Sequence, residues 1–319
     1  MAATCSSSFP SLLPLPKARI PKFSFYSSFT TSQSNFFTVT SRQNLINGDF
    51  VNNIRTPLTL LKAQASSVNG EKQPMLPPFN VLITGSSKGI GYALAKEFLK
   101  AGDSVIICSR GGERVESAVQ SLRAEFGDLL VWINNAGSNA YSYKPLAESS
   151  DEDLIEVVTT NTLGLMICCR EAMKLMLNQP RGGHIFNIDG AGSDGRPTPR
   201  FAAYGATKRS VVHLTKSLQA ELQMQDVKNV VVHNLSPGMV TTDLLMSGAT
   251  TKQAKFFINV LAEPAEVVAE YLVPNVRSVA GSGSTKPTYV RFLTGLKAYT
   301  QIFSRIVFGA RRNRFVVED

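Results

Sequence analysis

Short apolar runs alternate with amphipathic stretches through the middle of this chain. Residues 81–83 form an apolar run that leads into a glycine-rich turn, and residues 90–101 behind it have the apolar spacing of a helix. Apolar runs bounded by turn signals are typical of strands buried in a parallel sheet. Similar runs occur at residues 104–108, 131–134, 183–188 and 230–235. The pattern predicts an α/β fold built on a parallel sheet.

The turn after the first run has the glycine spacing GxxxGxG, at Gly85, Gly89 and Gly91. Glycine permits positive φ and lets the backbone approach a pyrophosphate closely, and the N–H groups that begin the next helix attract phosphate. A tight turn without a ligand can have the same glycines, so the strand before it and the helix after it matter. We therefore expect a dinucleotide site here. The same loop contributes Ser87, Lys88 and Ile90.

Tyr204 and Lys208 are four residues apart on a predicted helix, so their side chains share one face. An ammonium group beside a phenol favours the phenolate, which predicts a pKa of Tyr204 below its ordinary value of about 10. Such a tyrosine can donate and accept a proton. On an exposed helix the two side chains would simply face water, so the pair gains meaning only from the other motifs.

Taken together, the motifs TGxxxGxG, NNAG, YxxxK and PG, in this order between residues 80 and 262, resemble the short-chain dehydrogenase/reductase family. The resemblance implies a doubly wound, Rossmann-type parallel sheet in a single catalytic domain. It also implies a nicotinamide dinucleotide whose pyrophosphate lies on the three glycines. It places Asn135, Ala136 and Gly137 near the adenine ribose. At the nicotinamide carboxamide it places Pro237, Gly238, Val240 and Thr242.

The resemblance also implies the catalytic residues. Tyr204 would protonate a carbonyl as hydride arrives, Lys208 would lower the pKa of Tyr204 and hold the nicotinamide ribose, and Asn161 would hold a proton-relay water. Asn161 as a helix-surface amide is the alternative. The family's catalytic serine is expected near Gly190, where this chain has none. Either Ser193 substitutes as a hydrogen-bond donor, or the site works without one.

The residues after the second predicted strand indicate the cofactor. That strand ends in Ser109-Arg110, and a basic residue at this point accommodates a 2′-phosphate, whereas an acid would bind the ribose hydroxyls of NAD. Arg110 and Lys88 therefore predict NADPH, with NADH possible. A solvated arginine at a strand end is the alternative for Arg110.

The chain between Arg110 and Asn134 is shorter than the family pattern. It contains one predicted helix, at residues 112–125, and roughly one strand-plus-helix unit is absent near residues 126–130. Without that unit, the second strand would be an unprotected edge, and the helix would need a left-handed crossover or a change of face. We interpret the gap as an alternative transcript or an incomplete gene model, and we expect it to weaken NADPH affinity.

The two ends of the chain differ from its middle. Residues 1–48 contain no Asp or Glu and are rich in Ser, Thr and Phe. This composition predicts a plastid transit peptide at residues 1–65 and a linker at 66–79; a mitochondrial address and plain disorder are the alternatives. The reductase domain is expected at residues 80–277, followed at 278–319 by a linker and a basic amphipathic helix. That helix would lie on an anionic membrane surface or dock on the core or on another subunit.

Net charge and cysteine spacing exclude some functions. The formal net charge is +9, and residues 1–78 and 286–319 each contribute +5, so the middle is near neutral. A basic nucleic-acid surface on the catalytic domain is therefore not expected. The four cysteines and three histidines show no metal-ligand spacing.

The resemblance extends to one group within the family. The chain resembles the plant chlorophyll b reductases at residues 186–195, 193–208 and 236–248 and in the basic tail. This implies reduction of the 7-formyl group of chlorophyll b or chlorophyllide b to hydroxymethyl, in the chloroplast stroma and at the stromal face of the thylakoid membrane. Implied partners are a second copy, the longer sister reductase and light-harvesting complexes. A stromal ketoacyl-thioester reductase and a non-catalytic partner of the full-length reductases are the alternatives.

Overall fold

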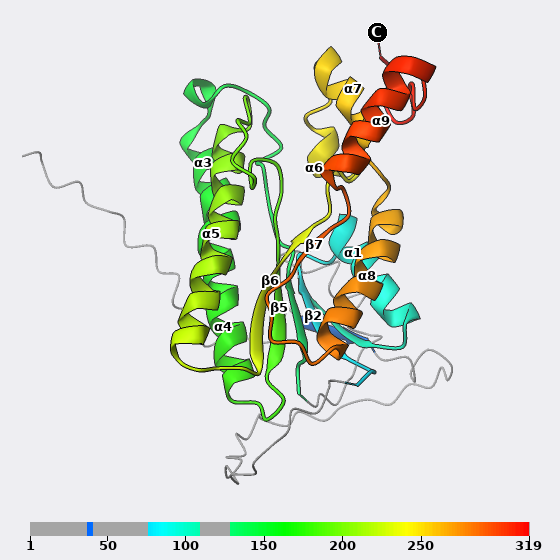
Figure 1. Ribbon diagram of the computed structural model, residues 1–319. Helices are drawn as coiled ribbons and strands as arrows, with labels where there is room; N and C mark the ends of the chain where they lie inside the picture. Colours follow the sequence, from blue (N-terminus) through cyan, green and yellow to red (C-terminus); the bar gives the residue numbers. More distant parts are fainter. Residues whose placement is uncertain (1–36, 41–75, 109–127, 319) are drawn as a thin grey trace, which may run out of the picture. The chain divides into compact units, whose positions relative to one another are not determined.

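A computed structural model of the chain describes residues 37–40, 76–108 and 128–318. Their strands form a seven-stranded sheet in the order β1-β3-β2-β4-β5-β6-β7, drawn in Figure 1. Strands β2 to β7 run parallel, as predicted, and β1 is antiparallel to β3. The strands are β1 (Phe37–Thr40), β2 (Asn80–Thr84), β3 (Ser104–Cys108), β4 (Val131–Asn134), β5 (Gly183–Ile188), β6 (Val230–Ser236) and β7 (Tyr289–Arg291).

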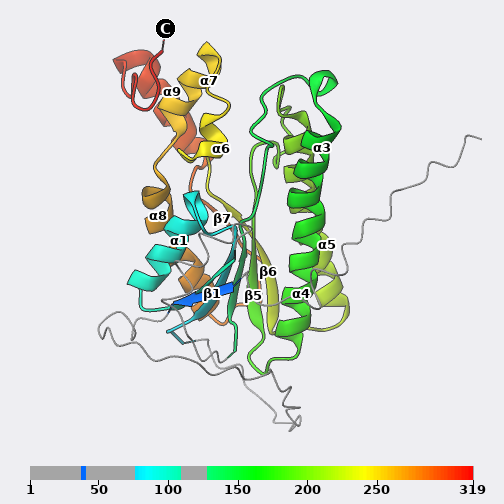
Figure 2. The ribbon, with the colours of Figure 1, turned by 180° about the vertical axis from the view of Figure 1, so that it is seen from behind.

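Helices cover both faces of this sheet. Helices α1 and α8 pack together on one face, and α4 and α5 lie against the other, as Figures 1 and 2 show from opposite sides. The helices are α1 (Gly89–Lys100), the short η2 (Leu146–Glu148), α3 (Asp151–Val158), the π-helix η3 (Thr159–Gly164), α4 (Leu165–Leu177), α5 (Ala202–Met224), α6 (Asp243–Met246), α7 (Lys252–Leu261), α8 (Ala265–Gly281) and α9 (Gly295–Phe308).

The two helical layers explain why the central strands are apolar throughout. Ile83 of β2 and Ile133 of β4 pack with Phe98 of α1 and Leu272 of α8 in one core cluster. Ile185 of β5 faces the opposite side, where it packs with Met176 of α4 and Val232 of β6. A sheet covered on both faces needs apolar residues at every position. The cores therefore hold the carboxyl ends of β2, β4, β5 and β6 at one edge, where the candidate site lies.

The edge next to β3 differs from the sequence-based expectation. Strand β1 pairs with β3 antiparallel, with Phe37 opposite Cys108 and Thr40 opposite Val105. The prediction that β3 is an unprotected edge is therefore wrong, because a strand from the predicted transit peptide occupies the place beside it. The predicted helix at 112–125, Arg110 and the crossover from β3 to β4 lie outside the described residues.

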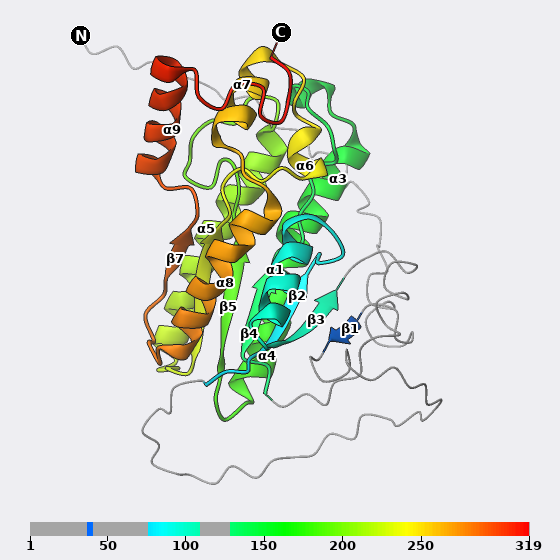
Figure 3. The same ribbon diagram turned by 90° about the vertical axis from the view of Figure 1, so that its right-hand side faces the viewer.

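The C-terminal boundary predicted at residue 277 also needs correction. Helix α8 continues to Gly281, and β7 pairs with β6, with Tyr289 opposite Asn234. Figure 3 shows β7 leading from the sheet to α9. The last strand of the sheet thus comes from the region expected to be a linker and tail. Its pairing places the residue Tyr289 at the same sheet edge as the candidate site.

Candidate active site

The glycine turn after β2 is shaped by close contacts that only glycine permits. Gly85 has a φ of +63° and Gly89 a φ of +59°, a region that disfavours other residues. A Cβ at Gly91 would lie 2.4 Å from the amide nitrogen Nδ2 of Asn135 and 2.6 Å from the carbonyl oxygen of Gly85. Helix α1 begins at Gly89, so Ile90 lies in its first turn and Ser87 and Lys88 immediately precede it. The turn therefore directs the N–H groups of α1 toward a ligand.

Thr84 and Asn135 tie this turn to the segment after β4. The amide of Asn135 donates to the carbonyl oxygens of Thr84 and Gly85, each at 2.9 Å. The hydroxyl of Thr84 accepts from the backbone N–H groups of Asn135 and Ala136, both at 3.1 Å. Ala136 is exposed beside the turn. The NNAG segment and the glycine turn thus form one cradle, and the binding of a cofactor to these residues stays a prediction.

A second turn closes the cradle from the C-terminal end of β6. Pro237 and Gly238 follow that strand, and Gly238 has a φ of +72°. Val240 is buried, and Thr242 reaches back so that its Cγ2 lies 3.2 Å from the Cβ that Gly89 lacks. The PG turn and the glycine turn, about 150 residues apart in sequence, therefore face each other across one site.

Lys88 makes its contacts across the cradle. Its Nζ lies 3.0 Å from Oδ2 of Asp243 and 3.0 Å from the hydroxyl of Tyr141. Those contacts raise the pKa of Lys88, the bond to Tyr141 most, so Lys88 stays positively charged. Arg110, the other predicted cation of the cofactor site, lies outside the described residues.

Tyr204 and Lys208 of α5 lie beside this cradle. The Nζ of Lys208 donates to the carbonyl oxygen of Ile188 at 3.2 Å and lies 5.7 Å from the centre of the Tyr204 ring. A Cβ at Gly137 would lie 3.5 Å from the same Nζ. The structure therefore brings the YxxxK pair, the end of β5 and the NNAG segment together.

The prediction of a lowered Tyr204 pKa is wrong. Burial, joined by the negative charge of Asp189, raises the pKa of Tyr204 above its ordinary value. Burial also lowers the pKa of Lys208, to about 8, although Asp189 opposes that shift. Helical spacing shows that two groups share a face, but it does not show how much water reaches them. A phenol that stays protonated suits the donation of a proton to a carbonyl.

Asn161 is buried in the π-helix η3, with 2% of its surface exposed. Its oxygen accepts from the backbone N–H of Ser138 at 2.8 Å. Its amide donates to the carbonyl of Ser138 at 2.8 Å and to the hydroxyl of Thr207 at 3.0 Å. The alternative of a helix-surface amide is therefore wrong. A π-helix inside a longer helix is common at functional sites, and the relay role of Asn161 stays a prediction.

The segment after β5 departs from the family pattern in a way the structure explains. A Cβ at Gly190 would lie 2.5 Å from the Tyr204 hydroxyl, so a serine there would displace the phenol. The Ser193 hydroxyl instead donates to Oδ2 of Asp189 at 3.0 Å. That oxygen also accepts from the hydroxyl of Tyr289. Ser193 as a substitute catalytic donor stays a prediction.

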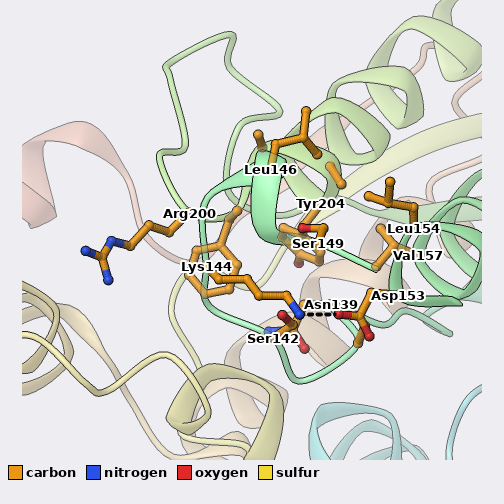
Figure 4. A pocket seen from close by; sticks show the side chains of 14 residues that line it. Asn139, Ser142, Lys144, Leu146, Ser149, Asp153, Leu154, Val157, Arg200 and Tyr204 are labelled. Atoms are coloured by element: carbon orange, nitrogen blue, oxygen red, sulfur yellow. Dashed lines mark ion pairs between the residues drawn. The ribbon is translucent and has the colours of Figure 1, made fainter. Parts of the chain in front are cut away.

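A pocket opens beside Tyr204, drawn in Figure 4. Its walls come from the loop after β4, from η2 and α3, and from the start of α5. Leu146, Leu154 and Val157 supply apolar surface, and an ion pair joins Lys144 to Asp153 at 3.0 Å. Tyr204 therefore borders this pocket, whereas the Nζ of Lys208 lies against the NNAG segment.

Comparison with known proteins decides the family. The family model described as short chain dehydrogenase matches residues 80–131 and 112–253. The chain belongs to the short-chain dehydrogenase/reductase family. It is therefore an NAD(P)H-dependent oxidoreductase.

Two curated plant proteins are similar over most of the chain. One, from Arabidopsis thaliana, is named chlorophyll(ide) b reductase NOL, chloroplastic; it is 71% identical over 296 residues, covering 83% of this chain and 85% of that protein. The other, from Oryza sativa subsp. japonica, has the same name and is 73% identical over 274 residues, covering 77% and 80%. The Arabidopsis protein named probable chlorophyll(ide) b reductase NYC1 is 39% identical and covers 68% and 51%.

Solved structures agree with the short-chain dehydrogenase/reductase fold. A 3-ketoacyl-(acyl-carrier-protein) reductase from Brucella melitensis, complexed with NADH, has a TM-score of 0.56 and 26% identity, covering 70% of this chain and all of that chain. An actinorhodin polyketide ketoreductase with NADPH has a TM-score of 0.57 and 25% identity, covering 69% and 97%.

Sequence reasoning missed Asp189 and Tyr289 as parts of the site. Asp189 was seen only as part of the segment that lacks the usual serine, and Tyr289 lay in the expected tail. The signal available for Asp189 was an acidic residue directly after a buried strand, at the edge where parallel strands place ligands. For Tyr289, 100 residues further along, the sequence offered no such signal.

Proposed function

We propose that this chain reduces the 7-formyl group of chlorophyll b or chlorophyllide b to hydroxymethyl, using NADPH. The observation that carries the proposal is the Tyr204–Lys208 pair beside the glycine cradle, in a chain 71% and 73% identical to two proteins named chlorophyll(ide) b reductase. A chloroplast location follows from the same names and from the acid-poor residues 1–48.

Different residues of the site have different roles in such a reduction. The cofactor, when bound, supplies hydride. Gly85, Gly89 and Gly91 let the backbone and the start of α1 hold its pyrophosphate, and the Lys208 ammonium holds its nicotinamide ribose. Tyr204, whose phenol stays protonated, donates its proton to the formyl oxygen. Asn161, which bonds the hydroxyl of Thr207, would hold the water of a hydrogen-bond chain that returns a proton through Lys208.

The rim of the pocket suits a large apolar substrate. Leu146 of η2 is about half exposed and lines the pocket that Tyr204 borders. Ile155 and Val158 are also about half exposed, on α3, which forms one wall of the pocket. Exposed apolar side chains grouped at a pocket mark a site for apolar ligands. A formyl group at the edge of a flat macrocycle can enter beside Tyr204 while the rest of the ring lies on this rim.

NADPH is proposed over NADH because Lys88 is an exposed cation directly before α1. A cation close to the adenine ribose attracts the 2′-phosphate that distinguishes NADPH. Its partner Asp243 is also exposed, so the phosphate can compete for the ammonium at low cost.

Product analysis tests the proposal directly. The purified full chain is incubated with NADPH and chlorophyllide b, and the pigments are separated and weighed by mass spectrometry. We expect a product two mass units heavier, with the absorption of a 7-hydroxymethyl pigment. Acetoacetyl thioester as the better substrate would favour the ketoacyl reductase alternative. A chain that binds NADPH but reduces neither would favour the non-catalytic alternative.

The pKa of Lys208 predicts the pH dependence of this reaction. Lys208 carries its positive charge below a pKa of about 8 and loses it above. Its ammonium is needed to hold the nicotinamide ribose, so we expect kcat/KM to be constant below pH 8 and to fall about tenfold per pH unit above it. Steady-state rates between pH 6 and 10 measure this. A flat profile up to pH 10 would show that the charge of Lys208 is not needed.

Helix α9 supports the proposed contact with the thylakoid surface. Leu296, Phe303 and Ile306 are 77%, 62% and 72% exposed, on a helix whose other side faces α7. Polar contacts hold this region: Arg305 pairs with Glu318, and Asn259 of α7 bonds the backbone that follows α9. The apolar face is therefore directed outward. No helix among the described residues is long and apolar enough to cross a membrane.

The charge around α9 favours an anionic lipid surface as its partner. Arg291, Arg312 and Arg314 are exposed near α9, and residues 286–319 have a net charge of +5. An apolar helix face bordered by cations is typical of helices that lie in the interface of an anionic membrane. A second copy or the longer sister reductase on the same face would be the competing occupants.

We expect the double substitution Tyr299→Glu and Phe303→Glu to reduce binding to anionic vesicles by about tenfold or more. The substitution removes two apolar side chains from contact with the lipid and adds two negative charges. Sedimentation with phosphatidylglycerol-containing vesicles measures it, and Met224→Glu, at an 86% exposed position on α5, is the matched control. Unchanged sedimentation of the double variant would contradict the membrane proposal. Loss of an oligomer instead would assign the face to a subunit.

The extents of the alignments support the proposed gap near residues 126–130. The Arabidopsis alignment runs over 296 residues but takes up 83% of this 319-residue chain, or about 265 residues. The difference is close to one strand-plus-helix unit. Transcript sequencing across this junction tests the gene-model version, which predicts reads that contain the unit. Reads that uniformly skip it would support a genuine short form.

A further inference from the structure

We infer that Asp189 is a positioning residue of this reductase, and that its carboxylate takes the place of the absent serine by keeping the Tyr204–Lys208 pair protonated. The inference rests on the proposed reductase function and adds a residue to it. It begins with the backbone. The carbonyl of Ile188 accepts from Lys208 at 3.2 Å, and Gly190 borders the Tyr204 hydroxyl. Asp189 stands between these two contacts.

The Asp189 side chain is held in a fixed position. It is 3% exposed, and its Oδ2 accepts from Tyr289 of β7 and from Ser193. Among the described residues Oδ1 has no hydrogen-bond partner. A buried charge without a full set of partners is costly unless another charge compensates it. In the described part of the chain, the ammonium of Lys208 is the cation whose charge lowers the pKa of the Asp189 carboxyl.

Other groups around Asp189 favour the charged form of the carboxylate without replacing Lys208. The hydroxyls of Tyr289, Ser236 and Ser193 favour the ionised form, although burial raises the pKa of Asp189 overall. Arg291 lies 3.8 Å from the centre of the Tyr289 ring, and Arg209 donates to the backbone carbonyl of Ser193 at 2.7 Å. In the part of the chain that the structure describes, neither of these two cations bonds the carboxylate.

The sign of the effect on the pair follows from the charge. A negative charge stabilises the ammonium of Lys208 and disfavours the phenolate of Tyr204, so it raises both pKa values. Both groups must keep their protons for carbonyl reduction. Removing the charge therefore releases both protons at lower pH. The alkaline limb, the part of the pH profile in which kcat/KM falls, then begins at a lower pH.

The test compares Asp189→Asn and Asp189→Ser, which remove the charge, with Tyr289→Phe, which removes a neighbouring hydroxyl and keeps the charge. Two readouts are measured between pH 6 and 10: kcat/KM with chlorophyllide b, and NADPH affinity from the fluorescence of the bound cofactor. We expect both alkaline limbs to move down by about one pH unit in the two neutral variants. The Tyr289→Phe limb should stay at the wild-type position.

The outcomes separate this inference from the function on which it rests. A wild-type chain that binds NADPH and reduces pigment, with unchanged limbs in both neutral variants, overturns the inference alone. An equal shift in Tyr289→Phe also overturns it, because packing rather than charge would then explain the effect. A wild-type chain without NADPH binding or pigment reduction overturns the proposed function, and the inference fails with it.

Discussion

Replacing Tyr204 by phenylalanine should reduce kcat for the formyl reduction by about 10³-fold, because the substitution removes the proton donor and nothing else. The Tyr204 hydroxyl lies against Gly190, where a side chain would collide with it, so this site has no second hydroxyl at that point. NADPH affinity should change by less than about threefold, since Lys208 and the glycine cradle are untouched. Stopped-flow or single-turnover rates measure the effect on the chemical step.

Tyr271→Phe is the control for that experiment. Tyr271 is 44% exposed on α8 and packs against Phe292, away from the site residues described above. It should keep wild-type turnover. A Tyr204→Phe variant with more than a tenth of the wild-type kcat would contradict the assignment of the proton donor.

Adding one methyl group at Gly91 should weaken NADPH binding by about 100-fold or more. A Cβ there would lie 2.4 Å from Nδ2 of Asn135 and 2.6 Å from the carbonyl oxygen of Gly85. Those contacts are too short to persist, so the turn and the NNAG segment must separate. The cradle then loses its shape although the chemistry of Tyr204 remains. Fluorescence titration of Gly91→Ala with NADPH gives the dissociation constant.

Gly295→Ala is a matched control on the same chain. A Cβ at Gly295 meets no atom within 4 Å, and alanine favours a helix more than glycine does. This variant should bind NADPH like the wild type and unfold at an equal or higher temperature. Equal NADPH affinities of Gly91→Ala and the wild type would show that the cofactor does not lie on this turn.

Local patterns predicted much of the fold, because a few consecutive residues specify a buried parallel strand or a glycine turn. The strands at 104–108 and 183–188 and the helix after Gly89 lie where the apolar runs placed them. The cradle was also predictable, since Gly91 and Asn135 belong to motifs of fixed order. What joins these elements in space is the sheet order, which no short stretch of residues specifies.

Contacts between distant segments were not predictable in the same way. Tyr289 reaches Asp189 because β7 pairs with β6, and no pattern in either segment indicates that pairing. Likewise the pairing of β1 with β3 depends on which edge a nearby strand can reach. The lowered pKa expected for Tyr204 failed for a related reason: burial and Asp189 act through the tertiary fold.

The central claim is that hydride passes from the nicotinamide to the formyl carbon beside Tyr204. Incubating the full chain with chlorophyllide b and NADPH deuterated at both C4 positions tests it most directly. Mass spectrometry should find one deuterium on the new hydroxymethyl carbon, and the Tyr204→Phe variant should form this product about 10³-fold more slowly. A folded chain that saturates with NADPH yet forms no deuterated product would contradict the account.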